Sequence, residues 1–439
     1  MTARTRAVLI SAPASGQGKT TVTAALARHA RQRGARVRVF KTGPDFIDPM
    51  ILERASEAPV YQLDLWMGGE EHCRALLHSA ALEADLILVE GVMGLYDGTP
   101  SSADLALTFS LPVLAVIDAS AMAESFGAIV LGLKQYREPL HLHGVLANRV
   151  AGEAHAAMLA RSLPASVVWL GALKQDASFT LPERHLGLMQ AVELADLSAR
   201  LDRAAEALGP TLDLQRLPQV SFPKPAQALP AAQSLRGVRI AIARDVAFSF
   251  LYAANLDLLR EMGAQVLFFS PLDDRELPQA DALYLPGGYP ELHAARLSAN
   301  APMMAALRAH AQAGKALFAE CGGMMLLMQS LTDIDGHVHR MAGVLTGSTR
   351  MYPTVQSLAL QSVHLSEREL RGHSFHYSRL ATAMQPWKRG TTQHGKAGEG
   401  IYRAGNVIAS YIHFYWPSSP SSIAHIFSPD APAAGASSA

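Results

Sequence analysis

Short, continuous apolar runs recur through the first half of this 439-residue chain, and helical stretches separate them. Continuous apolar runs are typical of strands that are buried on both faces of a sheet. Their alternation with helices predicts a doubly wound α/β domain with a parallel sheet, in which ligands bind beyond the carboxyl ends of the strands. The expected strands are residues 6–11, 36–41, 85–90, 112–118, 143–148 and 166–173, with helices at 19–33 and 124–136.

A stretch with five prolines, residues 208–236, breaks this alternation and predicts an interdomain linker. It would separate a first domain, residues 1–207, from a second, residues 237–417, and the chain is too long for a single core. A second α/β pattern follows the linker. Its expected strands are residues 238–243, 265–269, 282–286 and 315–319. Residues 418–439 are rich in Ser, Pro and Ala, which predicts a loose tail.

Composition limits the partners and the compartment. Lys plus Arg equals Asp plus Glu, at 38 each, which argues against a nucleic-acid surface or a polybasic membrane patch. Cys73 and Cys321 are far apart, which argues against a disulfide framework, and Cys73 in a helical pattern is expected to be a small buried residue. The start lacks a signal-peptide pattern, and no apolar run reaches the roughly 20 residues of a membrane helix. We expect a cytoplasmic protein without nucleic-acid or membrane partners.

A glycine-rich turn after the first expected strand has the context of a phosphate-binding loop. Gly16 and Gly18 let backbone N–H groups surround phosphate oxygens, Lys19 reaches the terminal phosphates, and the Thr20 hydroxyl can hold Mg²⁺. The full pattern has a glycine five residues before Gly18, where this chain has Pro13. The motif is therefore a variant, and taken alone it could be a glycine turn that caps a helix.

Charged residues also stand at the ends of two further expected strands. Glu90 ends the apolar run 86–89, where a P-loop domain places its second magnesium contact. Lys41 ends another strand and is followed by Asp45 and Asp48. Since carboxyl ends of parallel strands meet at one edge, these groups favour a ligand site over separate solvated loop charges.

Cys321 lies directly after the apolar run 316–318 and before two glycines. A thiol at a sharp turn between a buried strand and a helix points outward and receives the positive end of the helix dipole, which favours the reactive thiolate. His413 ends a β-prone run and is the expected base. Gly287 and Gly288 follow an expected strand, and their backbone N–H groups can stabilise an oxyanion.

Two further histidines, His373 and His376, have a spacing that is conceivable for a metal site. No cysteine or carboxylate cluster supports that interpretation. We expect a polar strand or a domain-interface contact instead.

These motifs together resemble the cobyrinic and hydrogenobyrinic acid a,c-diamide synthases, glutamine-dependent and ATP-consuming amidotransferases of cobalamin biosynthesis. The resemblance spans nearly the whole chain. Its motifs are residues 16–21, 41–49, 89–98, 148–150, 181–188, 286–291, 319–323 and 371–377. The first half is also similar to dethiobiotin synthetase. The resemblance implies two doubly wound domains, an N-terminal P-loop NTPase-like parallel sheet and a C-terminal class I glutamine amidotransferase-like domain.

The resemblance also implies a reaction of two halves. Cys321 would attack the glutamine amide with His413 as base, giving a glutamyl thioester and ammonia. A corrinoid carboxylate would take the γ-phosphate of ATP–Mg²⁺, and ammonia would displace phosphate from the acyl phosphate. The implied residues are Lys41 in catalysis; Gly16, Gly18, Lys19, Thr20, Thr21 and Asn148 at the nucleotide; Asp45, Phe46, Asp48 and Asp97 at the substrate; Gly287, Gly288 and Gly322 at the oxyanion; and Thr20, Glu90 and Asp48 at Mg²⁺.

Several questions stay open at this level. Many class I glutaminase domains have a glutamate two residues after the histidine, where this chain has Tyr415, so the orienting partner of His413 is unidentified. The cobalt-free and cobalt-containing rings are not separated, and a homodimer is left open. Alternatives are amidation of nickel sirohydrochlorin or of other corrin carboxylates. A different class of protein, a P-loop ATPase switch with a non-catalytic glutaminase-like scaffold, conflicts with the intact Cys321 and its candidate base.

Overall fold

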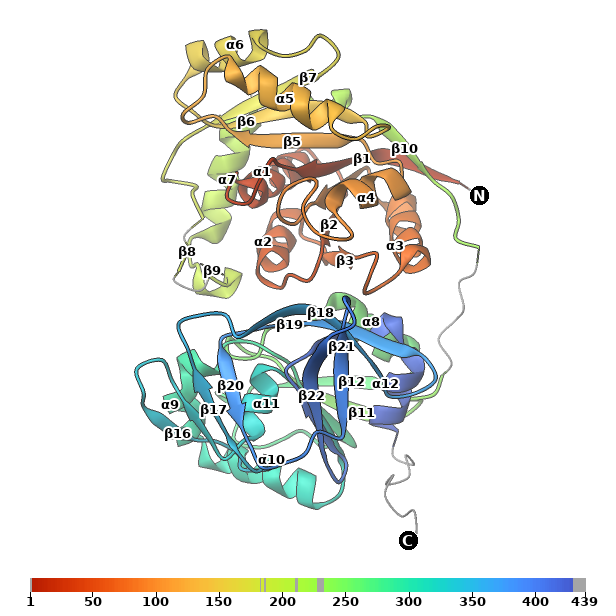
Figure 1. Ribbon diagram of the computed structural model, residues 1–439, viewed down its shortest axis with the longest axis vertical. Coiled ribbons are helices and arrows are strands. Elements are labelled where there is room, and N and C mark those ends of the chain that lie inside the picture. Colours follow the sequence, from red (N-terminus) through yellow and green to blue (C-terminus); the bar gives the residue numbers. More distant parts are fainter. Residues whose placement is uncertain (1, 182, 185–186, 210–211, 227–232, 429–439) are drawn as a thin grey trace. The chain divides into compact units, whose positions relative to one another are not determined.

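The computed structural model describes residues 2–181, 183–184, 187–209, 212–226 and 233–428. The chain divides into two compact units, Met1–Ala228 and Leu229–Ala439, and each is described by itself. Figure 1 shows the elements of both units. The motif at residues 181–188 lies partly outside the described residues, at positions 182, 185 and 186.

The first unit is built on a parallel sheet of strand order β3-β2-β4-β1-β5-β6-β7. Its strands are β1 (Ala3–Ser11), β2 (Val37–Thr42), β3 (Tyr61–Leu63), β4 (Leu86–Glu90), β5 (Val113–Asp118), β6 (Leu142–Val150) and β7 (Val168–Lys174). The doubly wound prediction is confirmed, and all six predicted strands are present. This parallel order also contains β3, which was not predicted. It is three residues long, too short to show a hydrophobic pattern in the sequence.

Helices cover both faces of this sheet. They are α1 (Lys19–Gln32), α2 (Ile47–Ser56), α3 (Glu70–Glu83), α4 (Ser102–Thr108), α5 (Ser125–Gln135), α6 (Glu153–Arg161) and α7 (Leu197–Leu208). One hydrophobic core packs α1, α2 and α7 against the sheet. A second hydrophobic core packs α3, α4, α5 and α6 against it. Cys73 lies in the second core with no exposed surface, as predicted, and burial raises the pKa of its thiol.

The proposed linker is structured over part of its length. Strand β10 (Gln219–Phe222) pairs antiparallel with β1 and buries Val220 and Phe222. The prediction of a linker over 208–236 is therefore wrong for this segment, because an alternating strand between prolines can still add to the free side of β1. The first unit extends to Ala228 rather than to residue 207.

The second unit contains a mixed sheet of order β12-β11-β13-β14-β23-β22-β21-β18-β19-β24. The first five strands are parallel, and the later neighbours are antiparallel. The strands are β11 (Arg239–Ala243), β12 (Gln265–Phe269), β13 (Ala282–Leu285), β14 (Ala316–Glu320), β18 (Ser357–His364), β19 (Glu369–His376), β21 (Lys388–Thr392), β22 (Ala397–Ala404), β23 (Val407–Ser410) and β24 (His413–Tyr415). The four predicted strands are confirmed, whereas the antiparallel part was not predicted.

A smaller sheet and five α-helices complete the described part of the second unit. The small sheet is β16 (Val338–Arg340), β15 (Ser330–Thr332), β17 (Ser348–Met351) and β20 (Ser378–Ala381), and the helices are α8 (Ala253–Glu261), α9 (Ala294–Ala299), α10 (Ala301–Gln312), α11 (Gly322–Leu327) and α12 (Pro420–Phe427). Helix α12 corrects the prediction of a loose tail from residue 418. Its Ile423 and Phe427 join a core with Phe318 and Trp416, because a short apolar helix gains stability from the surface it buries.

Residues 429–439 of the predicted tail lie outside the described residues. Within the part of the chain that is described, no helix has both the length and the apolar composition needed to cross a membrane.

Candidate active sites

The turn between β1 and α1 has the shape that its glycines predict. Gly16 and Gly18 have φ of 78° and 88°, a left-handed conformation that glycine adopts without steric cost. Gly18 caps α1, so the helix N-terminus opens directly at this turn. Lys19 is 8% exposed and donates from Nζ to the carbonyls of Met93 (2.6 Å) and Ala14 (3.3 Å). The turn therefore combines backbone N–H groups, a helix dipole and a nearly buried ammonium, the features of an anion site.

A cluster of charged residues lies beside this turn at the carboxyl ends of β2 and β4. Lys41 and Glu90 are register partners on these strands, and Lys41 Nζ lies 2.8 Å from Glu90 Oε1. The same ammonium lies 2.5 Å from Asp48 Oδ2 and 3.4 Å from Asp45 Oδ2. The Thr20 hydroxyl donates to Glu90 Oε1 at 2.9 Å. We call these five residues the acidic cluster; the fold brings together the groups that the sequence placed at separate strand ends.

Burial and mutual charge set the protonation of the acidic cluster. Burial and the neighbouring Asp48 raise the pKa of Asp45 to about 7. Burial also raises the pKa of Glu90, whereas Lys41 overcomes burial and holds the pKa of Asp48 below its usual range. Despite its own burial, the ammonium of Lys41 is stabilised by these carboxylates, which raise its pKa. The cluster can therefore hold or release a proton near neutral pH at Asp45.

One atom of the acidic cluster fits a bound cation. Glu90 Oε2 is buried, and within the described residues it has no hydrogen-bond partner. A buried carboxylate oxygen without a partner is costly, and a divalent cation would satisfy it. The Thr20 hydroxyl, which donates a hydrogen bond to the other carboxylate oxygen of Glu90, provides a second hard oxygen ligand of the kind that Mg²⁺ prefers.

A cavity of about 360 Å³ opens beyond the ends of β5, β6 and β7. Asn148 lies in its wall and donates from Nδ2 to the carbonyl of Gln17 at 2.9 Å, which ties β6 to the glycine turn. The full lining is Gly18, Thr21, Asp118, Ser120, Asn148, Arg149, Lys174, Gln175, Asp176, Phe179 and Thr180. The sequence pointed to Asn148 and Thr21 but missed residues 174–180, although their position after the predicted strand 166–173 was a usable signal.

Two predicted substrate residues lie next to these features. Phe46, at 8% exposure, caps the start of α2 between Asp45 and Asp48. Asp97 accepts the Gly94 N–H at 3.0 Å and lies near enough to Lys19 for its charge to act on the ammonium. Asp97 therefore shapes the loop after β4.

In the second unit, Cys321 occupies a strained turn between β14 and α11. Its φ of +45° is rare for a residue with a side chain, and its N–H donates to the Ser410 carbonyl at 2.8 Å. Glycines are required around it. A Cβ at Gly322 would lie 2.8 Å from Pro290 Cδ, and one at Gly323 would lie 2.1 Å from the Leu285 carbonyl oxygen. The turn therefore packs directly on the end of β13.

The turn at Gly287 and Gly288 links Cys321 to His413. The Cβ position of Gly322, the residue after Cys321, lies 3.2 Å from the backbone nitrogen of Gly288. A Cβ at Gly287 would lie 2.2 Å from His413 Cε1. The residues that the sequence predicts as nucleophile, base and oxyanion turn thus lie close together.

Aromatic rings pack around His413. The His373 ring stacks on it, with centroids 5.0 Å apart and planes 18° apart, and Phe250 lies at 6.0 Å. Burial lowers the pKa of His413 well below its usual value, and burial lowers that of His373 to about 3. His373 also contacts the Tyr252 hydroxyl at 3.1 Å. Both imidazoles are neutral at neutral pH, so His413 can accept a proton.

His373 and His376 lie on a strand, β19, as one of the two expectations had it, but both are buried beside the base. Tyr415, in the position where a glutamate completes the triad in other glutaminase domains, packs edge-on against Tyr252 at 5.3 Å. The sequence missed the role of Glu320. Its carboxylate accepts from the Phe414 N–H at 3.2 Å and so holds the strand of the base against the end of β14.

One prediction about Cys321 is wrong for the free protein. Burial raises the pKa of its thiol, and the negative charge of Glu291 raises it further. The dipole of the six-residue helix α11 does not offset these effects. Burial therefore favours the neutral forms of both the Cys321 thiol and the His413 imidazole.

Taken together, a phosphate-binding turn in one unit and a cysteine–histidine site in the other define a nucleotide-dependent glutamine amidotransferase. Family models agree with this class. Residues 8–188 match the CobQ/CobB/MinD/ParA nucleotide binding domain, and residues 239–421 match the CobB/CobQ-like glutamine amidotransferase domain.

Similar proteins cover nearly the whole chain. The chain is 59% identical to a hydrogenobyrinate a,c-diamide synthase of Stutzerimonas stutzeri, over 96% of this chain and 98% of the relative. It is 57% identical to a protein of the same name from Pseudomonas aeruginosa, over 97% and 98%. It is 49% identical to a cobyrinate a,c-diamide synthase of Herminiimonas arsenicoxydans, over 97% of each chain. This chain belongs to the family of hydrogenobyrinate and cobyrinate a,c-diamide synthases.

Proposed function

We propose that this protein is a carbon–nitrogen ligase that amidates the a and c side-chain carboxylates of hydrogenobyrinic acid, with glutamine as nitrogen donor and ATP as phosphoryl donor. One observation carries the proposal: the same chain has the Cys321–His413 site and the phosphate-binding turn with its acidic cluster. The names of the relatives at 59% and 57% identity support the cobalt-free ring, while the relative at 49% is named for cobyrinate.

The glutaminase half follows from the neutral pair. The Cys321 sulfur attacks the amide carbon of glutamine as its proton passes to His413. Backbone N–H groups of Gly287, Gly288 and Gly322 stabilise the oxyanion. Ammonia leaves after taking the proton from His413, and water hydrolyses the glutamyl thioester to glutamate and the free thiol. Each cycle thus converts one glutamine and one water into glutamate and ammonia.

The synthetase half supplies a leaving group, since a carboxylate is a poor acceptor for ammonia. A ring carboxylate attacks the γ-phosphorus of ATP, giving an acyl phosphate and ADP, and ammonia then displaces phosphate to leave the amide. Lys19 and Lys41 stabilise the charge on the transferring group. Thr20, Glu90 and Asp48 would hold Mg²⁺, which supplies further charge neutralisation.

The nucleoside of ATP fits the cavity of about 360 Å³. Its phosphates would extend from there to Gly16, Gly18 and Thr21, and Asn148 would contact the adenine. Asp45, Phe46, Asp48 and Asp97 lie on the side where the ring carboxylate must approach the γ-phosphate. In this proposal Asp45, with a pKa of about 7, stays protonated often enough to tolerate a nearby substrate carboxylate.

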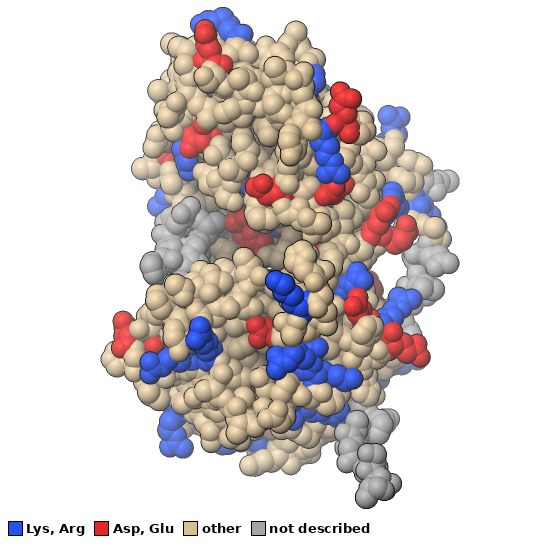
Figure 2. All heavy atoms as spheres, viewed as in Figure 1, with Lys and Arg blue, Asp and Glu red and all other residues tan. Residues whose placement is uncertain are grey.

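The proposed partners are small molecules, and the proposed compartment is the cytoplasm, where ATP and glutamine are available. Acidic and basic side chains are interspersed on the face of the first unit in Figure 2, which gives an extended polyanion little to bind there.

The test is an assay with ATP, Mg²⁺, glutamine and a mixture of hydrogenobyrinic and cobyrinic acids, read by mass spectrometry. Two acid-to-amide conversions of hydrogenobyrinic acid are expected, and no conversion of either ring would refute the proposal. Preferential conversion of cobyrinic acid would refute the choice of ring. Cys321→Ala should abolish glutamine-dependent synthesis and keep ammonia-dependent synthesis near the wild-type rate. Failure of ammonia to rescue a folded variant would refute the two-site reaction.

A further inference from the structure

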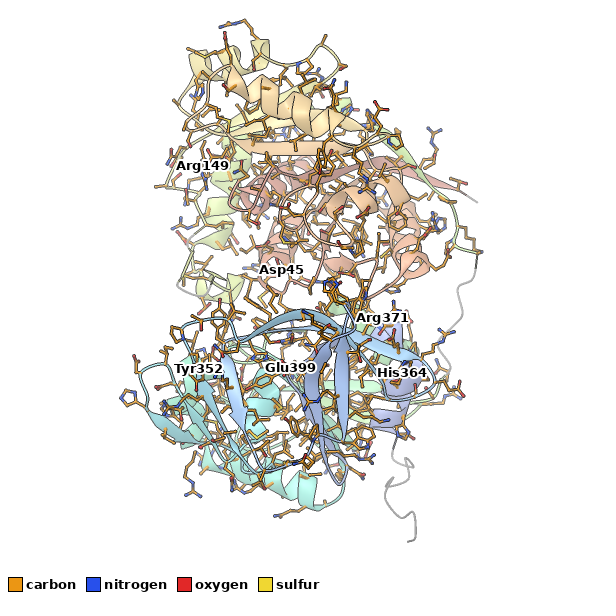
Figure 3. The ribbon with its side chains drawn as sticks, in the orientation of Figure 1. Asp45, Arg149, Tyr352, His364, Arg371 and Glu399 are labelled. Atoms are coloured by element: carbon orange, nitrogen blue, oxygen red, sulfur yellow. The ribbon has the colours of Figure 1, made fainter. Side chains whose placement is uncertain are left out.

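The second unit contains a histidine–glutamate pair that the reaction above does not use. His376 ends β19, and Glu399 lies on β22, with Nε2 and Oε1 3.2 Å apart. The His376 side chain is 7% exposed and the Glu399 side chain 23% exposed. The carboxylate, labelled in Figure 3, therefore remains reachable by a ligand while its partner is enclosed.

The contacts of His376 fix its ring beside Glu399. Its Nδ1 lies 2.9 Å from the Ser378 carbonyl oxygen, and its Nε2 faces the Glu399 carboxylate. One partner is a carbonyl oxygen and the other is a carboxyl oxygen, so both ring nitrogens of His376 are engaged. Although burial opposes ionisation, the hydrogen bond from His376 holds the pKa of Glu399 below its usual range. The imidazole ring stacks on Tyr411 at 3.8 Å.

A short chain of contacts connects this pair to the nucleophile. Tyr411 follows Ser410, whose carbonyl accepts the Cys321 N–H at 2.8 Å. The Ser378 hydroxyl donates to the Tyr411 hydroxyl at 2.8 Å and contacts Met325 Sδ of α11 at 3.6 Å. Glu399 is also near enough to Cys321 for its charge to act on the thiol. One aromatic ring thus separates the pair from the cysteine turn.

The backbone that carries Glu399 is held rigidly. Its N–H donates to Gln361 Oε1 at 2.7 Å, and Gln361 Nε2 donates to the Ser374 hydroxyl at 2.6 Å. A Cβ at Gly398 would lie 2.0 Å from Gln361 Oε1, so the glutamine fills the space above the neighbouring glycine. The carboxylate is therefore preorganised, a property that binding residues need and that chance surface charges lack.

We propose that Glu399, positioned by His376, binds the α-ammonium group of glutamine. The inference rests on the proposed glutaminase reaction and specifies how that site selects its amide. When the carboxamide of glutamine reaches Cys321, its amino-acid head group must lie at the other end of the side chain, where a charged partner is required. The positive α-ammonium would face the Glu399 carboxylate, while both ring nitrogens of His376 stay engaged with Ser378 and Glu399 and hold that carboxylate in place.

The experiment compares glutamine with glutaramate, which keeps the carboxamide and the carboxylate but lacks the α-ammonium. Ammonia release from both substrates, with glutamate from glutamine and glutarate from glutaramate, is measured for the wild type and for Glu399→Gln. For glutamine, kcat/KM should fall on the order of 10- to 100-fold in Glu399→Gln, mainly through KM, as expected for a lost charged hydrogen bond. For glutaramate, kcat/KM should change by less than about threefold. Glutaramate has no α-ammonium, so the substitution of Glu399 removes no contact to this substrate. His376→Phe, which retains a ring on Tyr411, should also raise KM for glutamine.

A matched control is available on β19, the strand that carries His376, and its neighbour β18. His364 and Glu369 are 4.0 Å apart at the opposite end of β18 and β19, with side chains 69% and 35% exposed. Glu369→Gln should leave kcat/KM unchanged for both glutamine and glutaramate. An unchanged preference for glutamine over glutaramate in Glu399→Gln would overturn the inference, and equal losses for both substrates would show a structural role. Absence of ammonia release by the wild type would instead refute the proposed reaction.

Discussion

Replacing Gly287 by alanine should disable the glutaminase reaction without affecting the use of free ammonia. The added Cβ would lie 2.2 Å from His413 Cε1 and 2.9 Å from Nδ1, whereas ordinary contact begins at 3.4 Å. The φ of Gly287 is not in the left-handed region, so alanine is compatible with the backbone itself. The steric clash is therefore with the imidazole ring of His413.

The size of the effect follows from this overlap. His413 is buried, with the His373 ring stacked on one face and the turn at Gly287 against its edge. Its ring must therefore move by more than 1 Å away from this turn to make room for the added Cβ. A displacement of about 1 Å at a reacting group typically reduces the rate about 100-fold. We therefore expect glutamine-dependent kcat/KM to fall about 100-fold in Gly287→Ala, with a loss of about 1–3 kcal/mol in the free energy of unfolding from overpacking.

The assay measures amide formation with glutamine and with ammonium chloride in parallel. Ammonia-dependent synthesis should stay within about twofold of wild type, because it does not need the base. Gly132→Ala is the control: its Cβ meets nothing within 4 Å, and both activities should be retained. Glutamine-dependent activity within about threefold of wild type in Gly287→Ala would refute the placement of His413 against this turn.

Two predictions concern buried charge. Lys41→Met leaves Asp45, Asp48 and Glu90 without their shared ammonium, so amide synthesis with either nitrogen source should disappear. Urea unfolding should show that the free energy of unfolding falls by about 3–5 kcal/mol. A stable, active variant would contradict the role assigned to Lys41. His373 has a pKa of about 3 in the fold, below its unfolded value near 6.5, so its stabilisation is complete above pH 6.5 and is lost as pH falls toward 3. Between pH 7 and 5 the wild type should lose about 2 kcal/mol more than His373→Phe, and equal losses would contradict this.

The sequence was sufficient for the features that depend on local conformation. The turn after β1 and the turn before α11 need glycines at fixed positions, and the observed φ of Gly18 and the close packing of Gly323 give the reason. The parallel strands were also predictable, since buried strands are continuously apolar. Strand β10 and helix α12 were missed because their local signals are weak and their stability comes from the cores they join.

The sequence by itself determined that a phosphate turn and a reactive cysteine occur in one chain, because each is encoded within a few residues. Only the tertiary structure decided which distant groups act on them. One sheet contains both β19 and β22, and it places His376 and Glu399 together and near Cys321, although the three lie far apart along the chain. Burial, which no local pattern measures, reverses the expected ionisation of the thiol. Proximity and solvent exclusion are properties of the assembled core, and they fix the chemistry of these side chains.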